Sequence, residues 1–461
     1  MRTLCTSGRA IALTGIVIVS LLLTSCGKDE GFTEVNVPTG YLRVVHTISD
    51  APSLQFIVDE RPEVNLSYGE SSGFINALPE LPILVQVVYY QERQPVIVAS
   101  MEVTIQQDHD FTIVASGTLD NPRLTTIDNP MPEFEAENTT AEIQFVHAAS
   151  GTPDALTFSA GQSATTTLGP GDTGELVTLA GDSEVNLDVS DAAANSLWST
   201  TTTLGPSTRT LLVLIDYFGP GGGDVRLIRV TGSGAGLFPS DYPSAIRVAN
   251  MIPDRGALDV TLDGTITLAD AIAFGNAGGD SYVNVPAGEH TIRVTLAGQP
   301  DNIIHEVSYL ITGGNYRTLT MTGLADSISS RMSTDDHRWR QVQVRSMMNV
   351  THASPSANPE HTSNAVDVYF LSGAETVAGR PPNAILGILD TSQLIMPEGT
   401  YDLVVTNQGS EDVLFGPQRI DFGPGGLYRI FLTDTTGGGT PMEIILSDGF
   451  VTQPAGLSNT L

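Results

Sequence analysis

The 461-residue chain has few cysteines and no long apolar run. Its two cysteines, Cys5 and Cys26, both lie in the first 26 residues, so the rest of the chain cannot form a disulfide. The apolar stretch at residues 10–23 is shorter than the about 20 residues that a membrane-spanning helix needs. No window has the period of a long amphipathic helix. These absences exclude a disulfide scaffold and a helical domain, and they leave stability to hydrophobic cores.

Positive charge is also scarce. The chain has 52 acidic and 21 basic residues, a formal net charge of −31, and Lys28 is its single lysine. Such a negative field repels phosphate backbones, so we expect no nucleic-acid partner. An acidic surface with little lysine suits an exported protein in a salty medium, although the base composition of a genome could produce the same bias.

The residues that are present repeat four times. The stretch 42–59 reads as a strand, a corner containing Pro52 and a second strand, and similar stretches begin near residues 143, 246 and 350. One position recurs as His46, His147, Asn250 and His352, in steps of 101, 103 and 102 residues. A period near 100 residues predicts one β-domain used four times.

Each repeat has the alternation of half-buried strands. Leu54, Phe56 and Val58 fall on one face of a strand, and Leu258, Val260 and Leu262 repeat the pattern. Short strands at regular spacing favour an all-β chain of four tandem immunoglobulin-like β-sandwiches. We predict the division as leader 1–25, tether 26–39, sandwiches 40–132, 139–232, 243–334 and 340–450, and tail 451–461. Segments rich in Pro, Gly, Ser or charge predict linkers at 128–140, 231–244 and 326–341.

The N-terminus has the layout of an export signal. Arg2 and Arg9 precede the apolar run at 10–23, which ends in Leu-Thr-Ser-Cys at 23–26. This ending resembles the lipobox of bacterial lipoproteins, which implies that Cys26 carries the lipid and becomes the first residue. Several acyl chains on one residue give a stable membrane anchor. Gly27 stands where an Asp typically retains such proteins at the inner membrane, so the resemblance implies the outer membrane. The alternative is an ordinary cleaved signal with a chance cysteine.

The repeat itself resembles the DUF4397 family. That family opens with a V-H-A-S-P run followed by A-V-D-V-Y, and this chain has Val-Thr-His-Ala-Ser-Pro at 350–355 and Asn-Ala-Val-Asp-Val-Tyr at 364–369. Closely similar copies stand at 43–52 and 145–150, whereas the copy at 247–250 has Asn in place of His. The resemblance implies an immunoglobulin-like sandwich in secreted or lipid-anchored bacterial proteins. It implies no particular chemistry.

The recurring histidine has two interpretations. His46, His147 and His352 could each ligate something with a nearby Asp, or each could hydrogen-bond the corner that follows its strand and fix its shape. Asn250 favours the structural role, because Asn can replace those hydrogen bonds but is a poor metal ligand. We therefore assign these four positions a structural role and predict no metal, cofactor or catalytic residue.

Three weaker patterns complete the search for chemistry. The Gly-Asp-Ser run ending at Ser183 resembles a hydrolase nucleophile motif, but its alignment with turns of the other repeats favours a turn. His352, Glu360, His361 and Asp367 lie in a loop that is longer in the fourth repeat and could hold Zn²⁺, although no CxxC or HExxH spacing supports this. Trp198 and Trp339 could form a sugar-stacking surface, but two tryptophans in four domains are more typical of core or linker positions.

The sequence therefore predicts a non-enzymatic envelope protein, anchored in the outer membrane through Cys26 and extending as an acidic rod. Its leading function is a cell-surface binding or adhesion module for an extracellular polymer or a protein partner. The alternative is a structural scaffold or spacer, and a hydrolase without a recognisable site comes third.

Overall fold

The computed structural model describes residues 39–448 except 92, 135–137, 153, 163, 221–224, 239–241, 278–281, 325–326, 358–363 and 440–442. Nearly all regular structure in this part of the chain is β-strand, and its one helix is a short 3-10 turn, η1 (His337–Arg340). Among these described residues no helix has the length and apolar character needed to cross a membrane. Cys26 and the tail lie outside the described residues, and of the tether only residue 39 is described.

The first two sandwiches are built from the strands of residues 40–130 and 140–237. The first contains β1 (Gly40–His46), β2 (Leu54–Val58), β3 (Arg61–Leu66), β4 (Ile75–Ala77), β5 (Pro82–Gln91), β6 (Gln94–Thr104), β7 (His109–Gly117) and β8 (Pro122–Pro130). The second contains β9 (Thr140–His147), β10 (Leu156–Ala160), β11 (Ala164–Leu168), β12 (Val177–Ala180), β13 (Glu184–Ser190), β14 (Ser196–Thr203), β15 (Thr208–Asp216), β16 (Val225–Thr231) and β17 (Gly234–Leu237).

The third and fourth sandwiches flank η1. The third contains β18 (Ser244–Met251), β19 (Leu258–Leu262), β20 (Ile266–Ile272), β21 (Val283–Val285), β22 (Gly288–Leu296), β23 (Ile303–Ile311), β24 (Tyr316–Leu324) and β25 (Ser327–Asp335). The fourth contains β26 (Ser346–Ala353), β27 (Val366–Leu371), β28 (Ala384–Leu386), β29 (Thr391–Met396), β30 (Gly399–Asn407), β31 (Val413–Phe422), β32 (Leu427–Thr433) and β33 (Glu443–Asp448).

All four sandwiches share one topology. One sheet has the order fourth-first-seventh-eighth strand, as in β4-β1-β7-β8, and the other has third-second-fifth-sixth, as in β3-β2-β5-β6; domain 2 adds β17 to its first sheet. The first and seventh strands pair in parallel, with Val44 opposite Ile113 and Val248 opposite Leu319. This arrangement confirms the predicted all-β chain of four tandem immunoglobulin-like β-sandwiches.

The sheet that contains the first strand is buried on both faces. One face packs into the core of its own domain, where Val44 and Ile113 meet Phe56 in domain 1. The opposite face of the domain 1 sheet packs against the corresponding face of domain 2 through an apolar cluster that includes Val45, Val114, Val146 and Val213. Two faces of buried apolar residues explain why these strands have near-continuous apolar runs rather than strict alternation.

Domains 3 and 4 pair through the same region of the fold. Their shared cluster contains Ala249 and Met251 of domain 3 with Ala353 and Phe431 of domain 4. The hydroxyl of Thr322 donates to the carbonyl oxygens of both Met251 and Ala353, which are equivalent residues 102 positions apart. In the first pair the equivalent residues Ser49 and Ser150, 101 positions apart, approach each other with their hydroxyl oxygens 3.3 Å apart. Contact between equivalent residues indicates an approximate two-fold relation in each pair.

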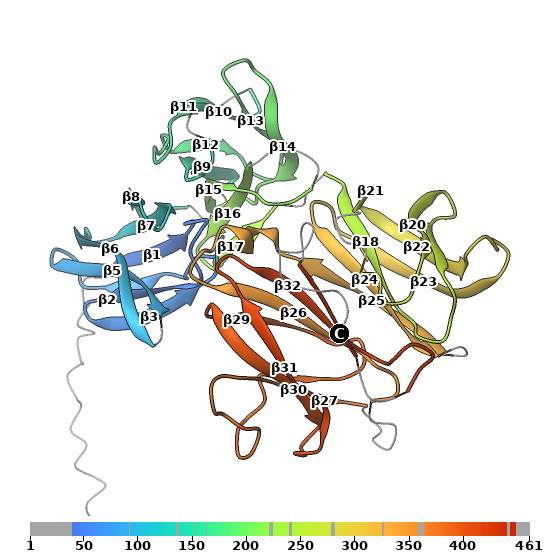
Figure 1. Cartoon of the computed structure of the whole chain (residues 1–461). Helices are drawn as coiled ribbons and strands as arrows, with labels where there is room; N and C mark the ends of the chain where they lie inside the picture. The colour runs from blue at the N-terminus through green and yellow to red at the C-terminus, as the bar shows by residue number, and fades with distance from the viewer. Residues whose placement is uncertain are drawn as a thin grey trace, which may run out of the picture.

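The chain then returns to its own beginning. Arg338 of η1 donates to the carbonyl oxygens of Ser49 and Ala51 in domain 1, and Arg345, just before β26, donates to the carbonyl of Tyr90. Figure 1 shows the four domains gathered around a common centre, with the blue first domain beside the orange fourth. The expected rod is therefore wrong, because apolar sheet faces and buried arginines hold the domains together.

Two of the predicted linkers also contain regular structure. Residues 234–237 form β17 on the edge of domain 2, and Ser327–Asp335 form β25, which pairs with β24 along its whole length. The polar composition of the second segment reflects an edge strand with one exposed face. On the other face of β25, Ile328 and Met332 pack against the domain 3 core.

Candidate functional site

A pocket of about 470 Å³ lies where domains 1, 2 and 3 meet η1. We call it the junction pocket, and its walls come from residues 67–70, 215–219, 235–236, 314–316 and 334–338. In sequence order these are the loop after β3, the end of β15 with the loop that follows, β17, the start of β24, and the end of β25 with η1. No single domain forms the pocket, so it exists only because domains 1, 2 and 3 and η1 are packed together.

Aromatic rings form much of the wall. The rings of Tyr68 in domain 1 and Phe218 in domain 2 meet edge to face, with centroids 6.5 Å apart. Tyr316 of domain 3 stacks on His337 of η1 at 3.9 Å and 15°. Burial and the nearby charges of Arg247 and Arg340 lower the pKa of His337 to about 3, so its imidazole is neutral at pH 7. The pocket therefore has largely apolar walls in which aromatic rings contact one another.

Arginines already cover several of these rings. The guanidinium carbon of Arg338 lies 5.1 Å from the centroid of Tyr68, and that of Arg226 lies 4.4 Å from the centroid of Tyr217. Beside the pocket, Arg247 lies 4.9 Å from the centroid of Tyr282. Each contact is a cation–π interaction, which is stronger where the cation is desolvated. Burial, the largest effect, lowers the pKa of Arg226 and of Arg338.

The carboxylates at the pocket fall into two groups. Asp335 is buried between Arg247 and Arg429, and it also accepts from the hydroxyls of Thr318 and Tyr282. Because two guanidiniums from domains 3 and 4 surround it, this carboxylate links those domains. Burial, the largest effect, lowers the pKa of Arg429 to about 9.

Asp216, also in the lining, is committed to local structure, since it accepts from Ser150 and from the backbone N–H of Gly151. Glu70 and Asp336, the other two carboxylates of the lining, accept fewer hydrogen bonds. Glu70 accepts from the N–H of Ser67, and Asp336 accepts from the N–H of Arg338. A carboxylate can accept about four hydrogen bonds, so both retain capacity for a ligand.

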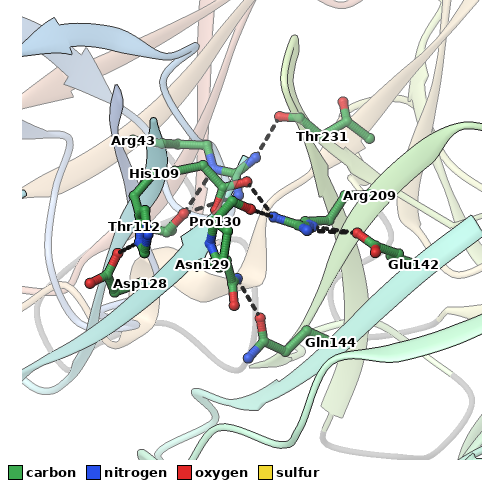
Figure 2. A network of polar contacts seen from close by, with 11 residues as sticks. Arg43, His109, Thr112, Asp128, Asn129, Pro130, Glu142, Gln144, Arg209 and Thr231 are labelled. Atoms are coloured by element: carbon green, nitrogen blue, oxygen red, sulfur yellow. Dashed lines mark hydrogen bonds and ion pairs between the residues drawn. The ribbon is translucent and has the colours of Figure 1, made fainter. Parts of the chain in front are cut away.

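A second polar network fixes domain 1 against domain 2 (Figure 2). Arg209 of β15 forms ion pairs with Asp110 of β7 and Glu142 of β9, and it also donates to the carbonyl of Pro130. Arg43 of β1 reaches across to the carbonyl of Thr231, at the end of β16. Burial raises the pKa of Asp110 and outweighs the opposing effect of Arg209. These contacts hold together domains 1 and 2, both of which line the junction pocket.

The recurring His/Asn position lies at the last or next-to-last residue of the first strand in each domain, and all four side chains are fully buried. His46 contacts the carbonyl of Pro52 through Nε2 at 3.1 Å and accepts from the N–H of Ile48 through Nδ1. Asn250 has matching contacts: its amide nitrogen donates to the carbonyl of Ile272, and its oxygen accepts from the N–H of Ile252.

His352 contacts the carbonyl of Asn364 at 2.8 Å, and the ring of His147 packs edge-on against Phe158. The four positions lie in four separate domains and none lines the junction pocket. Burial lowers the pKa of His46 to about 3 and lowers the pKa values of His147 and His352.

The other candidate residues are not brought together. Ser183 lies in an exposed turn and donates to the carbonyl of Ala180. Glu360, His361 and Cys26 lie outside the described residues, and within the described part of the chain no three His, Cys, Asp or Glu residues are grouped as metal ligands. Trp198 is buried in the domain 2 core and Trp339 in the interdomain segment, which confirms their expected core and linker positions.

The residues that line the pocket could not be predicted from the sequence. Tyr68, Phe218, Tyr316 and Arg338 come from four segments spread over 270 residues, and none belongs to a recognisable motif. One signal was available in the apolar runs of the first and seventh strands, such as Leu211 to Ile215, which indicate sheets covered on both faces.

Four two-layered β-sandwiches, three of which share the junction pocket, define a tandem β-sandwich protein. A family model described as a domain of unknown function, DUF4397, matches residues 40–155 and 244–369, and the chain belongs to this family. Each match covers one whole sandwich and the beginning of its partner in the pair. No curated protein gives a significant match to the chain.

Proposed function

We propose that this protein is a non-enzymatic, lipid-anchored envelope protein that binds an extracellular polymer or a protein partner through the junction pocket. The observation that supports this most directly is the pocket itself, which three domains and η1 build together from aromatic and carboxylate side chains. Its volume falls within the roughly 300–1,000 Å³ that is typical of ligand sites.

Preorganisation also supports binding. The pocket walls are held by the Asp335 pairs with Arg247 and Arg429, and by the bonds of Arg338 to domain 1. A site whose walls are already fixed loses less conformational entropy when a ligand binds. Such rigidity suits recognition, because the rings and carboxylates keep their spacing before the ligand arrives.

The anchor is proposed from the lipobox that ends at Cys26. A tether of residues 26–39 would reach about 45–50 Å when fully extended, which would hold the sandwiches clear of a membrane surface. Replacing Cys26 by Ser should release the protein from the membrane fraction and abolish labelling by a radioactive fatty acid. Retention and labelling in the variant would contradict this anchor.

Protease treatment of intact cells tests on which side of the outer membrane the protein lies. Fragmentation in intact cells would support a cell-surface binding module. Protection until the outer membrane is permeabilised would place the sandwiches in the periplasm and contradict adhesion at the cell surface.

Binding is tested with the purified mature protein in detergent, labelled at Lys28, the single lysine, which lies in the tether. We expect retention on immobilised extracellular polysaccharide or on cells, and we expect Phe218→Ala to reduce it at least tenfold. Leu310→Ala is the matched control, because this exposed apolar side chain lies on β23, away from the pocket. Equal retention of both variants and the unchanged protein would contradict the pocket as the binding site.

A structural scaffold is the second candidate. Its support is the closed arrangement, in which η1 and Arg345 tie the beginning of domain 4 back to domain 1. A scaffold requires this rigidity but not the pocket, so its function should survive Phe218→Ala and fail when the interdomain ion pairs are removed.

A further inference from the structure

We infer that the junction pocket takes an uncharged saccharide, one or two rings at the end of a polymer or in a short oligosaccharide. This inference rests on the proposed binding function and names the chemical class of its ligand. Four properties of the pocket lead to it: size, aromatic walls, the sign of its free charges, and the prior occupation of its ring faces by arginine.

Size and shape come first. The volume of about 470 Å³ accommodates a group of one or two sugar rings, and the pocket opens to solvent, so a longer chain can continue outside it. A purely apolar ligand would match the rings of Tyr68 and Phe218 but would offer no donor to the remaining acceptor sites of Glu70 and Asp336, which also line the pocket. Removing water from such acceptor sites without replacing its hydrogen bonds is unfavourable.

The aromatic walls match the faces of sugar rings. A pyranose presents C–H groups on its faces and hydroxyls around its rim. Aromatic rings carry negative charge on their faces, which attracts the weakly positive C–H groups, and they provide large apolar contact areas. Phe218 offers a ring with no polar atom, while Glu70 and Asp336 offer acceptors for the rim hydroxyls.

Anionic ligands are disfavoured by the free charges. Asp335 is neutralised by two arginines, and the charge of Asp336 acts on the neighbouring Arg338, but Glu70 has no ion pair to an arginine among the described contacts, and the whole chain carries −31. A uronate, sulfate or phosphate group would meet like charge both at the pocket and in the long-range field. The one lining guanidinium, Arg338, is occupied with carbonyl oxygens of domain 1 and with Tyr68.

Organic cations are disfavoured by the arginines. A cation is recognised best when it lies over an uncovered aromatic face. Here Arg338 lies over Tyr68 and Arg226 over Tyr217, so two of the tyrosines already hold a guanidinium. Tyr316 has His337 stacked on it. A second positive charge would be repelled by these guanidiniums, whereas the neutral C–H groups of a sugar would not.

The test is isothermal titration of the mature protein with trisaccharides of equal length and different charge. Maltotriose, cellotriose and N,N′,N″-triacetylchitotriose are the neutral probes, trigalacturonate is the anionic probe, and fully deacetylated chitotriose is the cationic probe. We expect at least one neutral probe to bind at least tenfold more tightly than either charged probe.

Variants assign the binding to the pocket. Phe218→Ala should weaken binding of the neutral probe at least tenfold, and Glu70→Gln should weaken it about threefold while improving the relative affinity of trigalacturonate. Leu310→Ala and Glu411→Gln are the controls, because both side chains are exposed and neither lines the pocket, and each should leave the affinity for the neutral probe unchanged. Thermal unfolding of each variant shows whether the fold is intact, and Glu70→Gln provides a second, conservative probe if Phe218→Ala unfolds the loop.

The outcomes separate the two claims. Tighter binding of trigalacturonate or deacetylated chitotriose that Phe218→Ala abolishes would overturn the saccharide class proposed here and leave the binding function standing. If no probe binds but cells still retain the protein through Phe218, the ligand is no saccharide and this inference fails alone. If neither probes nor cells depend on Phe218, the proposed function fails as well.

Discussion

At the scale of single residues, the buried His46 and Asn250 perform the same structural task in different domains. Each accepts from the N–H two residues ahead, and each contacts a carbonyl of a neighbouring segment. The single Asn among three His predicts this role from the sequence alone, because the hydrogen-bonding groups of the two side chains can be compared directly.

We predict that His46→Asn retains most of the stability of domain 1, whereas His46→Ala lowers the free energy of unfolding by about 2–4 kcal/mol. The alanine variant leaves the N–H of Ile48 without its acceptor and opens a cavity, and both effects are destabilising. Chemical denaturation followed by fluorescence measures the difference. Equal destabilisation by Asn and Ala would show that ring packing, and not hydrogen bonding, is what the position requires.

The buried imidazoles also predict an acid-sensitive fold. Burial lowers the pKa of His46 and of His337 to about 3 from the ordinary 6.5. Between pH 6.5 and 3 the unfolded chain therefore binds protons that the folded chain does not, so stability is complete above pH 6.5 and declines as pH falls. The expected slope is about 1.4 kcal/mol per pH unit for each histidine. Denaturation at pH 7.5, 6 and 5 measures the slope, and His46→Asn should reduce it; an unchanged slope would contradict this assignment.

At the scale of elements, β25 shows why strand prediction failed in one place. The segment from Ser327 to Asp335 is rich in Ser and reads as a linker, yet it pairs with β24 throughout. Its strand signal consists of Ile328 and Met332, spaced by four residues on the inward face. An edge strand with one solvated face needs few apolar residues, so composition alone understates it.

Asp335, the last residue of β25, is predicted to be essential for the association of domains 3 and 4. Asp335→Asn should destabilise the association of domains 3 and 4 by about 3–5 kcal/mol, because the buried guanidiniums of Arg247 and Arg429 lose their shared carboxylate. Thermal unfolding should change from one transition to two as the domains separate. Arg331→Ala is the control, since it removes an exposed ion pair with Asp390 and a 3.5 Å bond to the carbonyl of Leu389, and should cost about 1 kcal/mol or less. Similar losses from both variants would contradict a special role for Asp335.

At the scale of the whole molecule, the closed arrangement predicts compact dimensions in solution. A compact chain of this length has a radius of gyration of about 22–25 Å, and a linear array of four sandwiches would be considerably larger. Small-angle X-ray scattering of the mature protein should give the smaller value at low and moderate salt. We expect Arg338→Ala to increase it, because η1 then loses its bonds to Ser49 and Ala51. A radius typical of an extended array in the unchanged protein would contradict the closed arrangement.

The sequence could predict the domains but not their assembly. Repetition and alternation indicated four sandwiches because these signals act within about 100 residues. The junction pocket depends on Tyr68, Phe218, Tyr316 and Arg338, whose proximity is decided by how separate sheets pack. Local patterns carry no information on the angle between domains, which depends on interdomain pairs such as Arg209 with Asp110.

The interface between domains 1 and 2, where Ser49 meets Ser150, joins two parts of one chain and can therefore be weaker than an interface between separate molecules. Two separate sandwiches would have to find each other by diffusion, whereas here a short covalent connection from β8 to β9 keeps them at an effective concentration on the order of millimolar. An interface that would dissociate between free molecules is therefore sufficient within one chain. It also follows that a break in that connection would expose the apolar faces of Val45 and Val213, and a cut molecule would become prone to pair with its neighbours.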